Sequence, residues 1–393
     1  MSVTAPQGFR AAGVAAGLKA SGNPDVALVV NDGPSTAAAA VFTSNRCRAN
    51  PVLWSAEAIK TGSARAVALN SGGANCYTGA EGFALTHATA ELVAELLGEG
   101  GDPVGAVDVQ VCSTGLIGLL NDRDDLLAGV RAAHGELSPD GGAAAATAIM
   151  TTDSVAKQSV AQGADGEGRT FTVGGMAKGA GMLAPALATM LVVITTDADV
   201  DAATLDAALR ESTRVTFDRL DSDGCQSTND TVLLMASGAS GATPDAAALT
   251  EQVTAVCRDL ALQLLADAEG AEHEITIEVV NAASETDAED VGHEVARSNL
   301  FKTAVFGRDP NWGRILASVG TSDAQYDPAD LDVALNGVWV CRNSGPGEPA
   351  ESVSLDDRAV HVRIDLKAGD ASATVWTNDL THAYVHENSA YST

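Results

Sequence analysis

The chain has 393 residues, of which 46% are hydrophobic and only 4% aromatic, and its formal net charge is −29. This length predicts about two to three domain-sized units, whose cores must be built from Ala, Val and Leu. The strong negative charge argues against binding to nucleic acid or to anionic membranes, because both partners need a basic surface.

Targeting and metal-binding signals are both missing from the sequence pattern. The first residues lack a basic segment followed by an apolar one, and no apolar run reaches transmembrane length, so we expect a cytoplasmic protein. The six cysteines form no CxxC pair, and no Cys/His cluster has zinc-ligand spacing. A secreted disulfide framework is not expected in so long a chain with so few cysteines.

The first half of the chain alternates short apolar runs with amphipathic segments. Runs of about four to eight apolar residues predict strands, and apolar residues three or four positions apart predict helices. The predicted strands are Asp25–Asn31, Ala37–Thr43, Arg65–Asn70 and Val107–Cys112. The predicted helices are Glu81–Gly98, Asp124–Ala133 and Ala143–Met150. Two polar, glycine-rich segments, Gly135–Gly142 and Ala161–Gly168, are predicted to be surface loops.

The second half continues the same mixture of elements. The predicted strands are Leu191–Asp197, Thr231–Ser237, Ile275–Val280, Val333–Cys341, Ala359–Leu366 and Ala371–Trp376. The predicted helices are Asp201–Thr213, Asp245–Ala268 and Thr286–Ser298. Because strands and helices mix throughout, we expect an α/β or α+β fold with layers of sheet and helix.

The segment at the middle of the chain changes character at Thr189. Between Lys178 and this residue, glycine and proline punctuate the sequence, which predicts a loop. After Thr189 the apolar run predicts a buried strand. A threonine at such a junction is usually an ordinary strand residue whose hydroxyl bonds a nearby carbonyl. On this stretch alone, that is the favoured interpretation.

Two other predicted strands also end in loops of small residues. Asn70–Asn75 contains adjacent glycines that suit an anion-binding nest, although a tight turn is the favoured interpretation. Ser113-Thr114-Gly115 suits an oxyanion site, because a hydroxyl and a glycine amide can point at one oxygen and glycine lets the backbone approach closely. A capped turn would give the same pattern.

Charged groups give weaker signals. Asp230 and Glu269 are candidate carboxylates, but most such groups are solvated caps or helix-end charges. Asp309–Arg314 combines a turn, a large aromatic and a cation, and a structural corner is favoured slightly over a substrate-facing loop. The seven histidines are scattered and form no catalytic order. If the protein transfers or hydrolyses acyl groups, its base is therefore expected to be the α-amine of its own nucleophile rather than histidine.

Taken together, these motifs closely resemble the ornithine acetyltransferases, the bifunctional glutamate N-acetyltransferases of arginine biosynthesis. The resemblance covers nearly the whole chain and keeps the family's order. The matching segments are Gly8–Gly13, Val41–Thr43, Asn70–Asn75, Ser113–Gly118, Ile149–Asp153, Lys178–Met190, Ser227–Asp230, Lys302–Ala304, Asp309–Arg314 and Tyr384–Thr393. The combination is highly specific, whereas no single segment is.

The resemblance implies a layered sheet-and-helix sandwich similar to the self-cleaving N-terminal-nucleophile-like fold of aminopeptidases and ornithine acetyltransferases. The precursor would cut itself between Ala188 and Thr189. The products would be an α chain of residues 1–188 and a β chain of residues 189–393 that stay together as an α2β2 heterotetramer. Thr189 would be the nucleophile, and Thr114 and Gly115 would form the oxyanion hole.

The resemblance also implies the substrates and the groups that bind them. The acetyl group would move from N2-acetyl-L-ornithine to L-glutamate without a metal or an organic cofactor, and whether acetyl-CoA is a second donor stays open. The residues at substrate-binding positions are Thr151, Lys178, Thr189, Glu269, Asn388 and Thr393. Thr152 is an alternative to Thr151. Residues 184–187 are more polar in some family members, but the Gly-Met-x-x-Pro-x-x-Ala-Thr frame is kept, so cleavage is expected.

Elementary chemistry supports such a nucleophile. The α-amine of an N-terminal threonine has a pKa near about 7.7–8.0 before perturbation, so part of it is neutral at pH 7 and can take the proton from its own Oγ. Two alternatives stay open. One is an N-terminal-nucleophile aminopeptidase or amidohydrolase, with water as the acceptor. The other is an uncleaved binding or structural protein in which Thr189 is only a strand residue.

Overall fold

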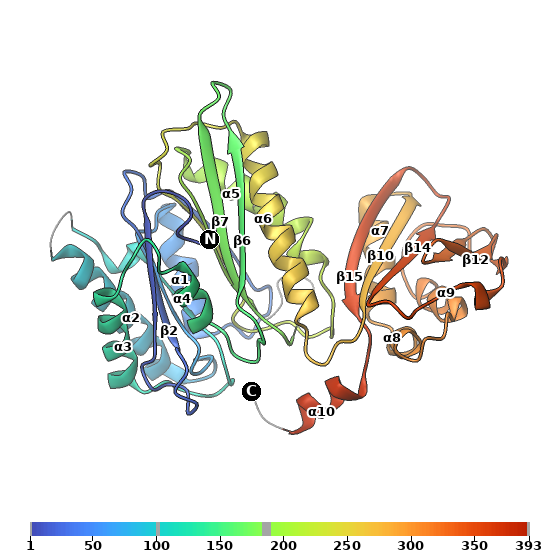
Figure 1. Ribbon diagram of the computed structural model, residues 1–393, viewed down its shortest axis with the longest axis horizontal. Coiled ribbons are helices and arrows are strands. Elements are labelled where there is room, and N and C mark those ends of the chain that lie inside the picture. Colours follow the sequence, from blue (N-terminus) through green and yellow to red (C-terminus); the bar gives the residue numbers. More distant parts are fainter. Residues whose placement is uncertain (1, 100–102, 183–189, 391–393) are drawn as a thin grey trace.

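Two β-sheets pack face to face in the first lobe of the computed structural model, which describes residues 2–99, 103–182 and 190–390 (Figure 1). In spatial order, the first sheet contains β1 (Phe9–Val14), β2 (Val26–Asn31), β4 (Ala66–Asn70) and β5 (Val109–Ser113). The second contains β3 (Ala38–Phe42), β9 (Thr231–Ala236), β8 (Leu191–Thr196), β7 (Thr170–Lys178) and β6 (Lys157–Ala164). One apolar core lies between these sheets and draws residues from both of them.

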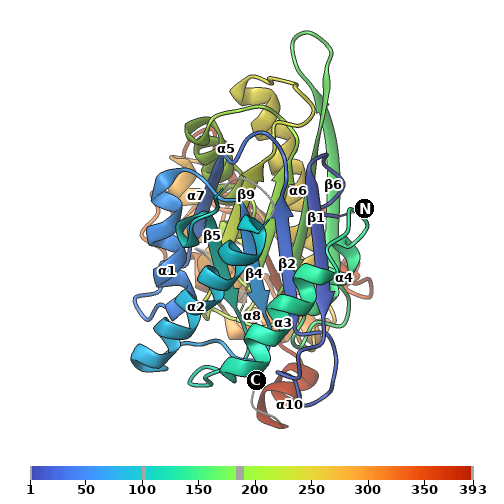
Figure 2. The same cartoon turned by 90° about the vertical axis from the view of Figure 1, so that its left-hand side faces the viewer.

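Helices cover the outer faces of this pair of sheets, as Figures 1 and 2 show. The first sheet packs against α2 (Gly79–Gly98) and α3 (Arg123–Gly135), and the second packs against α5 (Ala202–Arg214) and α6 (Ala246–Ala266). Two shorter helices, α1 (Asn50–Ala58) and α4 (Gly142–Ala148), pack beside β5 and β1. The lobe is therefore a layered helix–sheet–sheet–helix sandwich, which confirms the predicted fold class.

Strand β8 shows why the central apolar run was recognisable. Leu191 and Val193 point into the core between the sheets, whereas Val192 and Ile194 point into the core beneath α5 and α6. Successive side chains of a strand lie on opposite faces, so a strand that is covered on both faces is apolar without interruption.

A second lobe is built on a third sheet. In spatial order its strands are β13 (Gly345–Pro346), β12 (Val338–Arg342), β11 (Asp332–Leu335), β14 (Ala359–Asp365), β10 (Glu274–Ala282) and β15 (Ala371–Asn378). Its helices are α7 (Glu285–Ala296), α8 (Asn299–Phe306) and α9 (Trp312–Val319). The following helix, α10 (His382–Ala390), runs back beneath the junction of the lobes (Figure 1).

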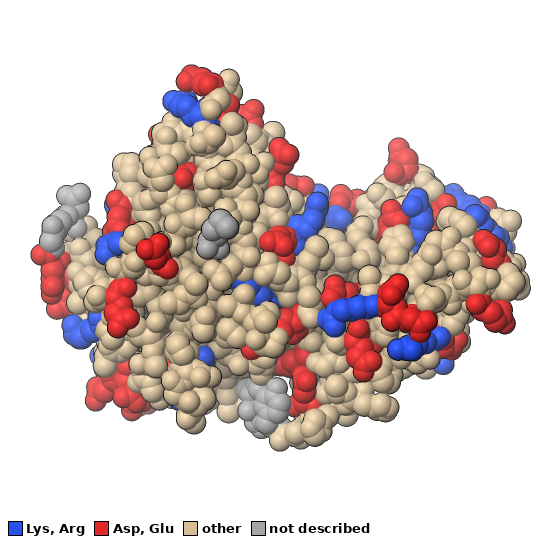
Figure 3. Space-filling model, in the orientation of Figure 1, with Lys and Arg blue, Asp and Glu red and all other residues tan. Residues whose placement is uncertain are grey.

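The remaining helical elements are short 3₁₀ turns. They are η1 (Ile59–Thr61), η2 (Ala106–Asp108), η3 (Phe217–Arg219) and η4 (Ala350–Ser352). Within the described ranges, no helix combines the length and apolarity needed to cross a membrane. Acidic side chains are scattered over both lobes on the face shown in Figure 3, as the net charge leads us to expect.

Two predicted elements were wrong or incomplete. Half of the expected loop Ala161–Gly168 is strand, because β6 runs through Ala164. The rest is the turn of a hairpin with β7, which was not predicted. The expected strand Val333–Cys341 is a hairpin that turns at Asn336-Gly337, where both residues have positive φ (46° and 84°). An Asn-Gly pair between apolar runs is a strong hairpin signal, so this turn was readable.

The segment Asp309–Arg314 is a structural corner, as the favoured interpretation held. The Asn311 side chain accepts a hydrogen bond from the Arg314 amide and caps α9. The guanidinium of Arg314 donates to the Leu300 carbonyl at 2.6 Å. These contacts tie α9 to α8 within the second lobe.

Candidate active site

Strand ends from both sheets meet at one end of the first lobe. In the first sheet, the last residues of the parallel strands β4 and β5, Asn70 and Ser113, are partners. In the second sheet, the last residue of β7, Lys178, pairs with the first residue of β8. The side-chain nitrogen of Asn229 joins the two sheets by donating to the carbonyls of Ala74 (2.6 Å) and Ser113 (2.7 Å). Loops that are distant in sequence are thereby held together.

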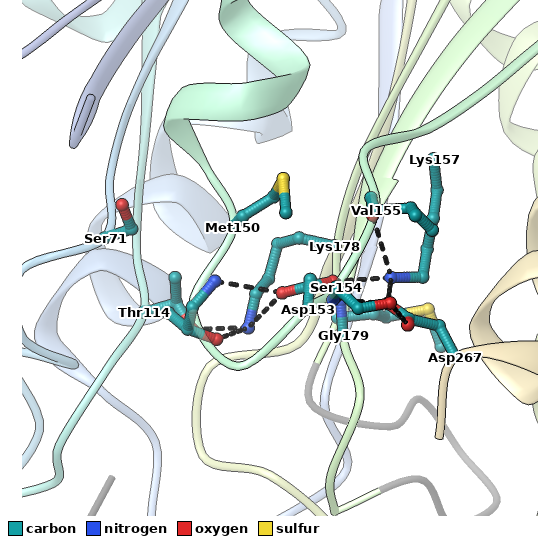
Figure 4. Close-up of polar contacts among 12 residues, drawn as sticks. Ser71, Thr114, Met150, Asp153, Ser154, Val155, Lys157, Lys178, Gly179 and Asp267 are labelled. Atoms are coloured by element: carbon teal, nitrogen blue, oxygen red, sulfur yellow. Dashed lines mark hydrogen bonds and ion pairs between the residues drawn. The ribbon is translucent and has the colours of Figure 1, made fainter. Parts of the chain in front are cut away.

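Lys178 is the centre of this arrangement (Figure 4). It was predicted to lie in a loop, but it is the last residue of β7 and is only 2% exposed. Its ammonium donates to Thr151 Oγ1 at 2.6 Å and to Thr114 Oγ1 at 3.2 Å. Burial lowers the pKa of Lys178, and the nearby carboxylate of Asp153 opposes that effect.

Asp153 holds the groups around Lys178 in place. One carboxylate oxygen accepts from the Gly179 amide (2.6 Å) and from Lys157 Nζ (2.7 Å), and the other accepts from the Thr151 amide (2.9 Å). The Lys178 ammonium lies 3.9 Å from the same carboxylate. Burial alone would raise the pKa of Asp153, but Lys178 and Lys157 lower it to about 2. The carboxylate is therefore ionised at neutral pH.

Lys157 extends the network away from the cavity. Its side chain is fully buried, and its ammonium also donates to Asp267 Oδ2 at 2.5 Å. Figure 4 shows Lys157 and Lys178 approaching Asp153 from different strands. Sequence reasoning missed Lys157 and Asp267, because the two partners are 110 positions apart. Asp153 was noted only as the end of a matching motif.

The predicted oxyanion loop has the required backbone freedom. Gly115 has φ of 125°, and a Cβ there would lie 3.0 Å from both the Gly72 carbonyl oxygen and Gly73 Cα, so only glycine fits. The Thr114 amide donates a hydrogen bond to the Asn70 carbonyl at 2.9 Å. Because Thr114 Oγ1 accepts from Lys178, the hydroxyl proton of Thr114 is free for another acceptor.

A cavity of about 220 Å³ collects most of the predicted site residues. Thr114, Gly115, Thr151, Lys178, Glu269 and Asn388 all line it, as does Thr152. The predicted residues Ala188, Thr189 and Thr393 lie outside the described residues. The lining also includes residues that sequence reasoning did not single out, namely Gly181, Met182, Asp223, Cys225 and Tyr384.

Glu269 is placed by contacts with the backbone on the far side of the cavity. Its amide donates to the Ala180 carbonyl at 2.9 Å, and its Oε2 accepts from Asn388 Nδ2 at 3.0 Å. A Cβ on Gly181 would lie 2.7 Å from that same Oε2, so a larger residue there would displace the Glu269 carboxylate. Two predicted substrate-binding residues, Glu269 and Asn388, are thus brought together by α10.

Two more carboxylates bind the chain on either side of residues 183–189. Asp223 Oδ2 accepts from the Met182 amide at 2.7 Å, and Asp230 Oδ1 accepts from the Met190 amide at 3.0 Å. The second oxygen of Asp230 has no hydrogen-bond partner in the part of the chain that the structure describes. Burial raises the pKa of Asp230, and burial together with Asp223 raises the pKa of Tyr384 to about 12.

Comparison with known proteins places nearly the whole chain in one family. Residues 10–393 match the model of the ArgJ family. The chain belongs to the ArgJ family. It is similar to the arginine biosynthesis bifunctional protein ArgJ of Streptomyces coelicolor, with 62% identity over 392 residues that cover 100% of both chains. The ArgJ protein of Mycobacterium tuberculosis is 56% identical over 395 residues, covering 99% of this chain and 96% of its own.

A solved structure is also similar over about half of the ArgJ-family chain. It is the ornithine acetyltransferase of Mycobacterium tuberculosis complexed with ornithine, with 54% identity and a TM-score of 0.43. The match covers 48% of this chain and 96% of that chain. Family membership confirms the resemblance found in the sequence and makes this protein an acetyltransferase of arginine biosynthesis.

Proposed function

We propose that this ArgJ-family enzyme moves the acetyl group of N2-acetyl-L-ornithine to L-glutamate through an acetyl-Thr189 intermediate. The observation that carries the proposal is the convergence of Thr114, Gly115 and Lys178 on one cavity that is also lined by residues just before segment 183–189. A hydroxyl and a glycine amide beside a buried ammonium suit a reaction that develops negative charge on an oxygen.

The proposed chemistry begins with attack by Thr189 Oγ on the acetyl carbonyl, with the α-amine of Thr189 as base. The developing oxyanion would accept hydrogen bonds from the Thr114 hydroxyl and the Gly115 amide, and one such donor is worth about 3–4 kcal/mol. Lys178 would bind the α-carboxylate of the amino acid. Ornithine would leave, and the amine of glutamate would then take the acetyl group from Thr189 in a ping-pong sequence.

The proposal includes self-cleavage between Ala188 and Thr189, which frees the α-amine. The precursor would yield an α chain of residues 1–188 and a β chain of residues 189–393, assembled as an α2β2 heterotetramer in the cytoplasm. Thr151, Glu269, Asn388 and Thr393 would complete the substrate contacts. No metal or organic cofactor takes part in the proposed steps, and acetyl-CoA would be a co-substrate if it is a donor.

Mass spectrometry with and without N2-acetyl-L-ornithine tests the proposal. We expect two chains instead of one, and an acetyl adduct on the chain that begins at Thr189. Thr189→Ala should leave one full-length chain without acetyl transfer, whereas the exposed control Thr147→Ala should behave like the wild type. A single full-length species in active material would refute cleavage. Release of acetate in place of N-acetylglutamate would support the amidohydrolase alternative.

A further inference from the structure

A second chamber of about 400 Å³ adjoins the candidate active-site cavity. The two share Asp223, Glu269 and Tyr384 as lining residues. The rest of the chamber is formed where the C-terminal lobe meets the two-sheet lobe, by Ser222, Gly224, Arg297, Asn299, Lys302, Asn378, Asp379 and Leu380. Its volume lies within the range of about 300–1,000 Å³ that is usual for small-molecule sites.

Lys302 is a buried cation whose direct hydrogen-bond partners are neutral groups. The residue is 5% exposed, and its ammonium donates to the Ser222 carbonyl and to Thr377 Oγ1 (3.3 Å). Burial lowers its pKa, and the carboxylates of Asp223, Asp221 and Asp379, which act on it through space, raise it by a smaller amount. Another buried lysine, Lys157, has two carboxylates within 2.7 Å. Because the pKa of Lys302 stays lowered by burial, the three carboxylates that act through space stabilise the ammonium only in part, and an anion bound in the chamber would stabilise it further.

Arg297 adds a second cation to the same chamber. Its Nε donates to Asp221 Oδ2 at 2.7 Å, and its side chain is 48% exposed. Within the described ranges, its two terminal nitrogens have no hydrogen-bond acceptor, so they are free for a ligand. A guanidinium presents its donors in a planar fork that matches a carboxylate.

The carboxylate of Asp379 acts on Lys302 only through space, because its hydrogen bonds go to other groups. Its oxygens accept from the amides of Glu272 (3.0 Å) and His273 (2.9 Å) and contact His273 Nδ1 at 2.7 Å. The other carboxylates of the lining, Asp223 and Glu269, lie in the wall shared with the active-site cavity. The shared wall therefore suits an ammonium, and the side of the chamber that is lined by Arg297 and Lys302 suits a carboxylate.

We propose that this chamber is the acceptor side-chain subsite, in which Lys302 and Arg297 bind the second carboxylate of a dicarboxylic amino acid. The inference rests on the proposed function, because it assigns a place to the acceptor of that reaction. Lys178 remains available for the α-carboxylate in the first cavity. A donor with a cationic side chain has no second carboxylate, so these two residues act mainly on the acceptor.

Acceptor discrimination tests the proposal. L-glutamine has nearly the shape of L-glutamate but lacks the side-chain charge. In Arg297→Gln and Lys302→Gln, kcat/KM for glutamate should fall roughly ten-fold or more, as expected for the loss of a hydrogen bond between charged groups. The ratio of kcat/KM for glutamate to kcat/KM for glutamine should fall with it. The control Arg214→Gln removes a half-exposed arginine that is ion-paired outside the chamber and should leave the ratio unchanged.

The donor half-reaction separates binding from folding. Ornithine release from N2-acetyl-L-ornithine should fall less in both variants than transfer to glutamate does. Equal losses in the two half-reactions, or an unchanged ratio of glutamate to glutamine in folded protein, would overturn the subsite. If Lys302→Gln does not fold, the more exposed Arg297→Gln decides the outcome. Failure of the wild type to use glutamate at all would instead refute the proposed function.

Discussion

Replacing the carboxylate of Asp153 by an amide tests the network on which the candidate site is built. Asp153→Asn keeps the shape of the side chain but removes its charge and one acceptor. The amide nitrogen would face donors on either side, because the carboxylate receives hydrogen bonds from Thr151, Lys157 and Gly179. Lys178 would lose its nearest carboxylate.

The structure sets the size of the expected loss. The pKa of Asp153 falls from 3.8 to about 2 on folding, and a shift of this size corresponds to about 2 kcal/mol of stability at neutral pH. Removing one partner of a buried ion pair typically costs about 3–5 kcal/mol. We therefore expect Asp153→Asn to lower the free energy of unfolding by about 3 kcal/mol.

The pH dependence gives the loss a signature. The folded-state pKa of Asp153 is depressed, so its stabilisation is present above about pH 4 and disappears as the pH falls towards 2. In urea unfolding, the gap between wild type and Asp153→Asn should be largest at pH 7 and should shrink below pH 4. The exposed control Asp140→Asn should stay within about 0.5 kcal/mol of the wild type.

A double variant checks the physical reason. Lys157→Met, added to Asp153→Asn, removes an ammonium that has lost one of its two carboxylates. The double variant should therefore lose less free energy of unfolding than the sum of the losses in the two single variants. An Asp153→Asn protein as stable as the wild type at pH 7, or a gap that does not change with pH, would refute the reasoning.

Four further predictions follow from single positions. Gly115→Ala should slow acetyl transfer roughly 100-fold with little change in circular dichroism, because a Cβ would meet the Gly72 carbonyl and displace one oxyanion donor. Asn229→Leu leaves two buried carbonyls without their donor and should cost about 2–4 kcal/mol in urea unfolding. Gly337→Val should cost more than about 1 kcal/mol, because φ is 84°, while assayed transfer is retained. The lowered pKa of Lys178 means that its ammonium is lost at a lower pH than that of an exposed lysine; KM should therefore rise on the alkaline side in the wild type but not in Lys178→Arg.

The sequence predicted elements best where burial is simple. Strand β8 is covered on both faces and was recognised from its apolar run. Strand β7 was missed because Gly174 and Gly175 interrupt the pattern. A Cβ on Gly174 would lie 2.3 Å from the Ser2 carbonyl oxygen, and one on Gly175 would lie 2.8 Å from Val256. These glycines let the N-terminal segment and α6 pack closely against β7. Such contacts between distant segments cannot be read from the local sequence pattern.

The site was predictable to the extent that it lies in motifs. Thr114, Gly115 and Lys178 stand in short segments that the family resemblance identified, and the cavity brings them together. The partners that hold them were harder to find. Lys157 donates to Asp267, which is 110 positions away in the sequence. Lys302 lines a chamber that forms only where the two lobes meet, so the sequence did not indicate its role.

The strand order of the five-stranded sheet has a consequence for making the protein in pieces. Its order, β3-β9-β8-β7-β6, places two strands from beyond residue 189 between strands from before it. A polypeptide starting at Thr189 would therefore expose both edges of its β8–β9 pair, and bare edges recruit other chains. Residues 1–188 and 189–393 should aggregate when they are produced separately. When they are produced in the same cell, they should assemble into one sheet and dissociate only in denaturant.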